Sequence, residues 1–219
     1  MSKRAGSLLM VLGLLLLLSA AAIAGYNIWD SNRAAESSRS IALQLTEQIP
    51  EVSGTDTNYA ALDVTEQGNV ILPEQEVPDY VLVPQMKMPE ETVDGIAYIG
   101  VLEIPDLGLN LPVASNWSYP LLRQTPCRYT GSAYTNDLVI AAHNYDQHFG
   151  NLKKLFHDSE FRFTDMAGNV FTYQVVELET LAPTAIAEMT SFAEGLTLFT
   201  CTVGGKSRIA LRAVLVESE

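Results

Sequence analysis

The chain has 219 residues, of which 47% are hydrophobic and 18% are charged, and its formal net charge is -13. This composition is typical of one folded domain with appended segments, and it excludes an intrinsically disordered protein. The negative charge repels phosphate groups and no basic cluster offsets it, so we expect no binding to nucleic acid.

The N-terminal residues predict a membrane-spanning helix. Lys3 and Arg4 precede a stretch without charge that runs from Ala5 to Trp29. As a helix, this stretch would extend ~37 Å at ~1.5 Å per residue, enough to cross a hydrocarbon core of ~30 Å. Because basic residues favour the cytoplasmic side, we expect residues 1–4 to form a cytoplasmic tip and the C-terminal bulk to lie outside the cell membrane.

A cleavable signal peptide is the alternative interpretation of this stretch. The residues Ala22-Ile23-Ala24 have the small side chains of a cleavage site. The apolar segment is longer than the ~7–15 residues of a typical signal core, which favours an anchor over residues 5–29. Both interpretations export the rest of the chain.

Residues 30–93 are expected to connect the anchor to a domain. The apolar residues of 33–49 lie four apart and a proline follows them, which predicts a stalk helix. Residues 51–94 carry ten acidic side chains and one basic side chain, Lys87, with four prolines among them. Such a segment buries little apolar surface, so we expect an extended acidic spacer in which residues 80–83 are the part suited to dock on the domain.

Residues 94–219 are expected to form one mostly β domain. Short apolar runs rich in β-branched residues alternate with Gly, Pro, Asn and Asp, as in strands and turns. Strands are expected at Ile96–Ile104, Leu109–Val113, Leu138–His143, Val170–Leu178, Leu196–Val203 and Arg208–Val216, and short helical segments at Gly150–Phe156 and Thr184–Ala193. Because strand and helix do not alternate regularly, the pattern indicates a closed or nearly closed β-barrel with short helices.

The two cysteines, Cys127 and Cys201, have two possible uses. In an exported chain a disulfide between them is one alternative. The second alternative is a free, reactive thiol at Cys201. It is indicated by the residues after Cys201, where Gly204-Gly205 is suited to a two-residue hairpin turn. That turn would place Cys201 directly opposite Arg208, with Cβ atoms ~5 Å apart on one face.

A guanidinium beside a thiol has a chemical use. It favours the thiolate, and it can donate hydrogen bonds to an oxyanion that forms on a substrate. Arg212 shares the face of Arg208 but lies roughly 13 Å farther along the strand, at ~3.3 Å per residue. Arg208 is therefore the candidate partner of Cys201, and the alternative is an ordinary strand cysteine beside a solvated arginine.

A thiol nucleophile usually works with an imidazole, and the chain has three histidines. His143 follows the apolar run Leu138–Ala142 at the end of an expected strand, whereas His148 and His157 lie in polar, loop-like surroundings. A single histidine in such a place is more often structural than catalytic. Its combination with Cys201 and Arg208 makes His143 the candidate acid–base group.

These residues resemble the active-site motifs of sortases. The segment Thr197-Leu198-Phe199-Thr200-Cys201, followed by Arg208, is similar to the Thr-Leu-x-Thr-Cys signature of that family. Ala141–Asn144 resembles the segment with the family's catalytic histidine, and Tyr98–Pro105 resembles its first barrel strand. The resemblance covers roughly residues 94–219, and it implies a closed eight-stranded β-barrel.

The resemblance also implies a reaction. Cys201 would attack the threonine carbonyl of a sorting signal such as Leu-Pro-x-Thr-Gly or Asn-Pro-x-Thr-Asn and form a thioacyl enzyme. His143 would protonate the leaving amine, Arg208 would steady the substrate and oxyanion, and Thr200 would belong to the substrate-binding site. The implied partners are surface proteins with a C-terminal sorting signal and an amine acceptor, either a cell-wall precursor or a pilin lysine, at a Gram-positive cell surface.

The class within the family is less clearly indicated. His143-Asn144 and residues 149–155 resemble class B sortases. The segment between Thr180 and Leu196 is too short for the long helical insertion of that class, and the spacer lacks the Asp-Pro-aromatic lid motif of class C.

Two other functions stay open from the sequence. A disulfide-bridged extracytoplasmic binding module explains export and both cysteines, and a hydrolytic cysteine peptidase explains the same three residues without transfer. His143 and His148 have no grouping of cysteines or carboxylates that would complete a zinc site. Neither a metal nor a cofactor is therefore expected in the reaction.

Overall fold

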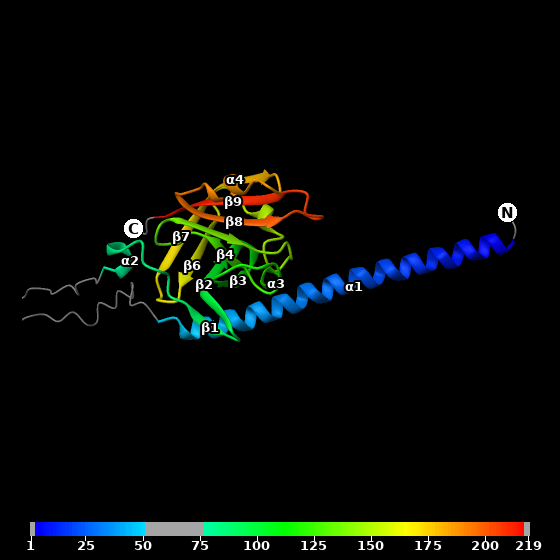
Figure 1. Cartoon of the computed structure of the whole chain (residues 1–219), viewed down its shortest axis with the longest axis horizontal. Coiled ribbons are helices and arrows are strands. Elements are labelled where there is room, and N and C mark those ends of the chain that lie inside the picture. The colour runs from blue at the N-terminus through cyan, green and yellow to red at the C-terminus, as the bar shows by residue number, and fades with distance from the viewer. Residues whose placement is uncertain (1–2, 51–76, 217–219) are drawn as a thin grey trace, which may run out of the picture.

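The computed structural model describes residues 3–50 and 77–216 (Figure 1). Most of the expected acidic spacer, residues 51–76, lies outside the described residues. The helices are α1 (Lys3–Gln48), α2 (Asp79–Leu82), α3 (Tyr119–Leu122) and α4 (Ile186–Thr190), with 3₁₀ helices η2 (Pro105–Leu107) and η3 (Leu152–Lys154). The strands are β1 (Glu91–Val93), β2 (Ile96–Ile104), β3 (Leu109–Ala114), β4 (Cys127–Thr130), β5 (Asp137–Ala141), β6 (Glu160–Asp165), β7 (Val170–Leu181), β8 (Gly195–Cys201) and β9 (Arg208–Leu215).

The strands form one sheet that closes on itself. Their order is β1-β2-β3-β4-β5-β8-β9-β7-β6, and β2 also pairs with β6. This additional pairing closes β2 to β9 into an eight-stranded barrel, and β1 adds to β2 at its start. The expected mostly β fold with a closed barrel and short helices is therefore confirmed.

The alternation of side chains explains why the barrel has an apolar interior. In β5, β8 and β9, residues such as Leu138, Leu198 and Leu211 point inward and belong to the main core cluster. Their neighbours Ala141 and Phe199 belong to a second cluster with Met189 of α4. Because successive side chains in a strand point to opposite faces, these strands are apolar on both sides and read as continuous hydrophobic runs.

The sequence located some strands better than others. Each of the six expected strands is present, although the strand expected to reach His143 ends at Ala141. The strands β1, β4 and β6 were not expected. The two expected helical segments are shorter than predicted and correspond to η3 and α4.

Helix α1 is one unbroken helix that combines the apolar segment and the stalk. Figure 1 shows its C-terminal part lying along the barrel and its N-terminal part extending beyond it. Ala34, Ile41, Ala42 and Leu45 are buried, and the last three pack with residues of β1 to β4. Ala34 lies seven residues, or about two turns, before Ile41, and Leu45 lies one turn after it, so these residues present one face of the helix to the barrel.

The exposed part of α1 is strongly apolar. Among the residues that the structure describes, α1 is the single helix long and apolar enough to cross a membrane. Its most apolar window has a mean hydropathy of 2.3, and none of that window is buried. The same helix therefore has one part that packs on protein and another whose apolar side chains are not covered by the described residues.

Candidate active site

Cys201 and Arg208 face each other at one end of the barrel. Cys201 is the last residue of β8, Arg208 is the first residue of β9, and the antiparallel register pairs them directly. Directly opposed residues lie on the same face of a sheet. The pairing predicted from the hairpin is therefore confirmed.

The turn that joins the two strands differs from the expected one. The backbone N–H of Gly205 donates to the carbonyl of Thr202 at 2.8 Å, which centres the tight turn on Val203-Gly204 rather than on the two glycines. The N–H of Thr202 donates to the carbonyl of Ser207 at 3.0 Å. A loop of four residues thus replaces a loop of two, and both leave Thr202 opposite Ser207, so the register is unchanged.

His143 reaches the same end of the barrel from the neighbouring strand. Ala141, at the end of β5, pairs with Phe199 in the parallel register with β8. The N–H of Ala142 donates to the carbonyl of Phe199 at 3.1 Å, and the Thr200 hydroxyl donates to the carbonyl of Ala142 at 2.9 Å. Parallel strands end at the same edge, so His143 and Cys201 each follow two residues after this aligned pair.

The side chains of this end differ in exposure. Cys201 is exposed and free, and Arg208 is half-buried. The Nη1 group of Arg208 donates to the carbonyls of Gly205 at 3.2 Å and Ser207 at 3.1 Å. The loop backbone thus holds the guanidinium near the end of the strand that carries the thiol.

Cys127 lies in a different layer of the protein. It is fully buried and free in the cluster between α1 and the barrel, and this burial raises the pKa of its thiol to about 12. Strand β5 lies between β4 and β8. Two strand spacings amount to about 10 Å, beyond the ~7 Å that a disulfide spans between Cα atoms. The expected alternative of a bridge to Cys201 is therefore incompatible with this fold.

His143 is half-buried against the aromatic ring of Tyr145. The two rings stack with centroids 4.1 Å apart and an interplanar angle of 16°. Burial lowers the pKa of His143 below its usual value; the nearby Arg123 also lowers it, while Asp30 acts in the opposite direction. These groups face a cavity of about 370 Å³ lined by Tyr26, Asn27, Asp30, Arg123, His143, Asn144 and Tyr145.

The other two histidines have different surroundings. His148 is fully buried, and its Nε2 lies 3.3 Å from the hydroxyl of Ser38 on α1. Burial lowers the pKa of His148 to about 4. His157 is exposed and pairs with Asp158 at 2.7 Å. Neither histidine lies directly at the end of β5, as His143 does two residues after Ala141.

Arg212 is held inside the structure rather than at the active-site end. Its side chain is only 5% exposed and forms a salt bridge of 2.7 Å with Glu179. It also donates to the Thr197 hydroxyl at 2.9 Å and to the carbonyls of Met189 and Glu188. Arg212 therefore ties α4 and β7 to β8 and β9.

A row of aromatic rings leads away from Cys201 on the same face. Phe199, two residues before Cys201, packs edge-on against Tyr129 with centroids 5.2 Å apart, and Tyr129 lies 5.2 Å from Trp117. A cavity of about 440 Å³ is lined by Trp117, Tyr129 and neighbouring residues of β4 and of the segment that follows β3. The sequence pattern does not indicate this row of aromatic residues, because only the folded sheet brings them together.

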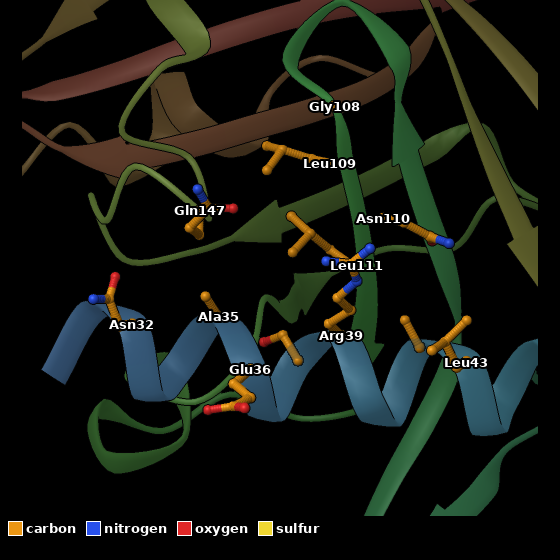
Figure 2. A pocket seen from close by; sticks show the side chains of 12 residues that line it. Asn32, Ala35, Glu36, Arg39, Leu43, Gly108, Leu109, Asn110, Leu111 and Gln147 are labelled. Carbon is orange, nitrogen blue, oxygen red and sulfur yellow. The ribbon is translucent and has the colours of Figure 1, made fainter. Parts of the chain in front are cut away.

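A larger cavity, of about 640 Å³, lies away from this site between α1 and the start of β3. Figure 2 shows Arg39 extending from α1 toward Leu111. Small residues of the helix, Ala35, Ser38 and Ala42, also line this space. The cavity contains no candidate catalytic residue. Within the described ranges no group of three or more metal-ligating side chains is present either.

The comparisons with known proteins agree with this arrangement. The family model of the Sortase domain matches residues 102–216, which is more than half of the chain. No curated protein sequence matches the chain. Many solved structures share its fold, among them three sortases.

A Clostridium perfringens sortase D5 transpeptidase is 24% identical, with a TM-score of 0.51, over 58% of this chain and 83% of that one. Sortase C1 of Streptococcus agalactiae is 20% identical, with a TM-score of 0.52, over 66% and 79% of the two chains. Sortase C of Streptococcus pneumoniae is 21% identical, with a TM-score of 0.51, over 62% and 77%. At these identities the likeness concerns the fold, and the family follows from the domain match: the chain belongs to the sortases, a family of cysteine transpeptidases.

Proposed function

We propose that this sortase cleaves a sorting signal of the Leu-Pro-x-Thr-Gly or Asn-Pro-x-Thr-Asn type after its threonine and transfers the acyl part to an amine. The observation that carries the proposal is the position of three residues at one end of the barrel. Cys201 and Arg208 are directly paired, and His143 follows the strand beside them. An exposed thiol, a guanidinium and an imidazole are the groups that acyl transfer through a thioester requires.

In the first step, Cys201 has given its proton to His143, and its thiolate Sγ forms a bond with the threonine carbonyl carbon. The carbonyl oxygen becomes an oxyanion, which the guanidinium of Arg208 stabilises. Nη1 of Arg208 donates to the loop carbonyls, and its Nε and Nη2 have no hydrogen bond to the described part of the chain. As the intermediate collapses, the peptide C–N bond breaks and His143 gives a proton to the leaving amine.

In the second step, the acceptor amine attacks the thioester carbon and gives its proton to His143. The C–S bond breaks, and the thiolate of Cys201 is restored together with protonated His143. The acceptor is an amine of a cell-wall precursor or a pilin lysine. Thr200 contributes to the substrate-binding site by holding the backbone at Ala142, to which its hydroxyl donates.

We also propose that α1 anchors the enzyme in the cell membrane with the barrel outside. The support is the apolar stretch from Ala5 to Trp29, preceded by Lys3 and Arg4. Intact-mass analysis of the membrane fraction distinguishes a retained anchor from a cleaved signal. Protease added to intact protoplasts should then remove the barrel and leave a membrane-bound fragment.

Mass spectrometry of the purified full chain tests the reaction. The chain is incubated with a small library of sorting-signal peptides, with and without an amine such as triglycine. We expect an acyl adduct on Cys201 and an amide product with the amine. A free carboxylate as the only product, even with excess amine, would indicate a hydrolytic peptidase. Peptide retention without an adduct would indicate a binding module.

A further inference from the structure

Helix α1 contacts the loop that carries His143. The hydroxyl of Tyr145 donates a hydrogen bond of 2.5 Å to Oδ2 of Asp30. The side chain of Asp30 is only 17% exposed, and it is the first charged residue after the apolar stretch of α1. A side chain next to the proposed anchor is thus bonded to a residue that touches the candidate acid–base group.

Tyr145 transmits this contact to the imidazole of His143. Its ring stacks on the ring of His143 with centroids 4.1 Å apart. The backbone of the loop is held separately, because the carbonyl of Tyr145 accepts from the N–H groups of His148 at 3.0 Å and Gly150 at 2.9 Å. The remaining freedom lies in the two rings. The hydrogen bond to Asp30 removes rotation of the tyrosine, and the stacked face then restricts the imidazole.

The cavity beside His143 also connects α1 with the candidate acid–base group. Tyr26, Asn27 and Asp30 of α1 line it together with His143 and Tyr145. Figure 1 agrees, because the loop between β8 and β9 lies at the end of the barrel from which α1 runs toward its N-terminus. Part of the wall around the candidate acid–base group is therefore supplied by the helix and not by the barrel.

We propose that Asp30 and Tyr145 are positioning residues that hold the imidazole of His143 in its working orientation, so that α1 forms part of the active site. This inference rests on the proposed role of His143 in the reaction. It gives α1 a second task besides attachment. A sortase whose α1 is displaced at Asp30 keeps its thiol and its barrel but loses the alignment of its acid–base group.

A purely structural role of the hydrogen bond is the competing explanation. The helix already packs on the barrel through Ile41, Ala42 and Leu45, more than two turns beyond Asp30. Loss of this one partly buried hydrogen bond near the end of the contact should therefore change stability little. A loss of turnover without an equal loss of stability distinguishes positioning from attachment.

The first test measures turnover of the full chain in detergent micelles with a sorting-signal peptide. Tyr145→Phe removes the hydroxyl and keeps the stacking, and Asp30→Ala removes the acceptor. We expect each to lower kcat by about 10-fold with little change in KM, since misplaced catalytic groups cost rate rather than substrate binding. The double variant should lose no more than either single one. Asp30→Asn keeps an acceptor oxygen and should recover most of kcat.

Matched control variants remove a carboxylate or a tyrosine hydroxyl at exposed positions outside the cavity beside His143. Glu36→Gln changes an exposed carboxylate of α1, and Tyr119→Phe removes the hydroxyl of an exposed tyrosine. Both should keep the kcat of the parent chain. Additive losses in the double variant, or a loss of kcat that is matched by lost stability and not recovered in Asp30→Asn, would overturn the positioning role.

The second test does not depend on activity. NMR spectra of the full chain with ¹³C-labelled histidine report the ring and the pKa of His143. The charged groups around this ring are Asp30 and Arg123, with Tyr145, Tyr26 and His148 nearby. Removal of the Asp30 carboxylate should lower the pKa of His143, and Tyr145→Phe should shift its ring signals while those of His157 stay in place.

The two tests separate the two proposals. A parent chain that forms no thioacyl adduct refutes the proposed function, and the NMR shifts then still decide whether Asp30 and Tyr145 position His143. An active parent chain whose His143 signals and kcat are unchanged in both single variants refutes the positioning role alone.

Discussion

The hydroxyl of Thr200 donates a hydrogen bond of 2.9 Å to the carbonyl oxygen of Ala142, and each of these residues immediately precedes a proposed catalytic residue. Thr200→Val keeps the shape of the side chain but leaves the buried carbonyl without this donor. We expect it to lower the free energy of unfolding by about 1–3 kcal/mol and to reduce turnover. Thr200→Ser should retain both. Urea denaturation and a peptide-cleavage assay measure the two effects, and a fully stable and active valine variant would contradict the assignment.

Cys201→Ala and His143→Ala should each abolish cleavage while the fold stays intact. Neither change removes core volume, because Cys201 is exposed and His143 is half-buried. Circular dichroism and thermal melting check the fold, and product analysis checks cleavage. If His143→Ala kept near-normal turnover while His148→Ala lost it, the assignment of the acid–base group would be wrong.

The two arginines of β9 should respond differently to lysine. Arg208→Lys lacks the planar fork and should lower turnover by about 10²-fold with little change in stability. Arg212→Lys should lower the free energy of unfolding by about 1–3 kcal/mol, because a lysine ammonium keeps the charge opposite Glu179 but cannot reproduce all the hydrogen bonds of the guanidinium to Glu179 and the two carbonyls. Its turnover per folded molecule should change little. Equal losses of turnover at both positions would argue against Arg208 as the oxyanion donor.

Alkylation should distinguish the two thiols. Cys201 is exposed, whereas Cys127 is buried and its pKa is raised to about 12. Iodoacetamide near neutral pH should therefore label Cys201 in the native chain, and Cys127 should react after denaturation. Non-reducing peptide mapping should find no bridge, and Cys127→Ser should keep activity. Preferential labelling of Cys127 would contradict this arrangement.

Stability should fall in mild acid because of His148. Burial lowers its pKa from 6.5 to about 4, so between these values the unfolded chain binds a proton that the folded chain does not. The free energy of unfolding is therefore not reduced by His148 above pH 6.5. As the pH falls from 6.5 to about 4, protonation of His148 in the unfolded chain lowers the free energy of unfolding by about 3 kcal/mol. Chemical denaturation from pH 7 to pH 4 measures it. His148→Gln should flatten the curve over this range, and an unchanged slope would contradict the prediction.

The strands that could be predicted are those with a long apolar pattern. β2 and β9 were placed closely because eight or nine residues carry the signal. β1 and β4 have only three and four residues, too few to show a period. β6 does alternate, because the buried Phe161 and Phe163 are separated by the exposed Arg162, and this pattern is visible in the sequence.

Some contacts of the candidate site join residues that are near in the sequence, and others join residues that are far apart. The pairing of Cys201 with Arg208 follows from one hairpin, although the turn centre was misplaced by one residue. The place of His143 depends on the parallel pairing of β5 with β8, which the local sequence does not specify. Asp30 and Tyr145 are 115 positions apart, and only the docking of α1 brings them together. No local pattern in the sequence encodes such a contact.

The continuity of α1 couples the angular position of the barrel to that of the N-terminal half of the helix. One helix carries both the exposed apolar stretch and the face with Ile41 and Leu45 that packs on the barrel. Each residue of an α-helix turns the chain by about 100° and advances it by ~1.5 Å. The number of residues between the two parts therefore sets both the azimuth of Cys201 around the helix axis and its height along that axis. An unbroken helix fixes both this azimuth and this height, whereas a flexible linker would leave both free.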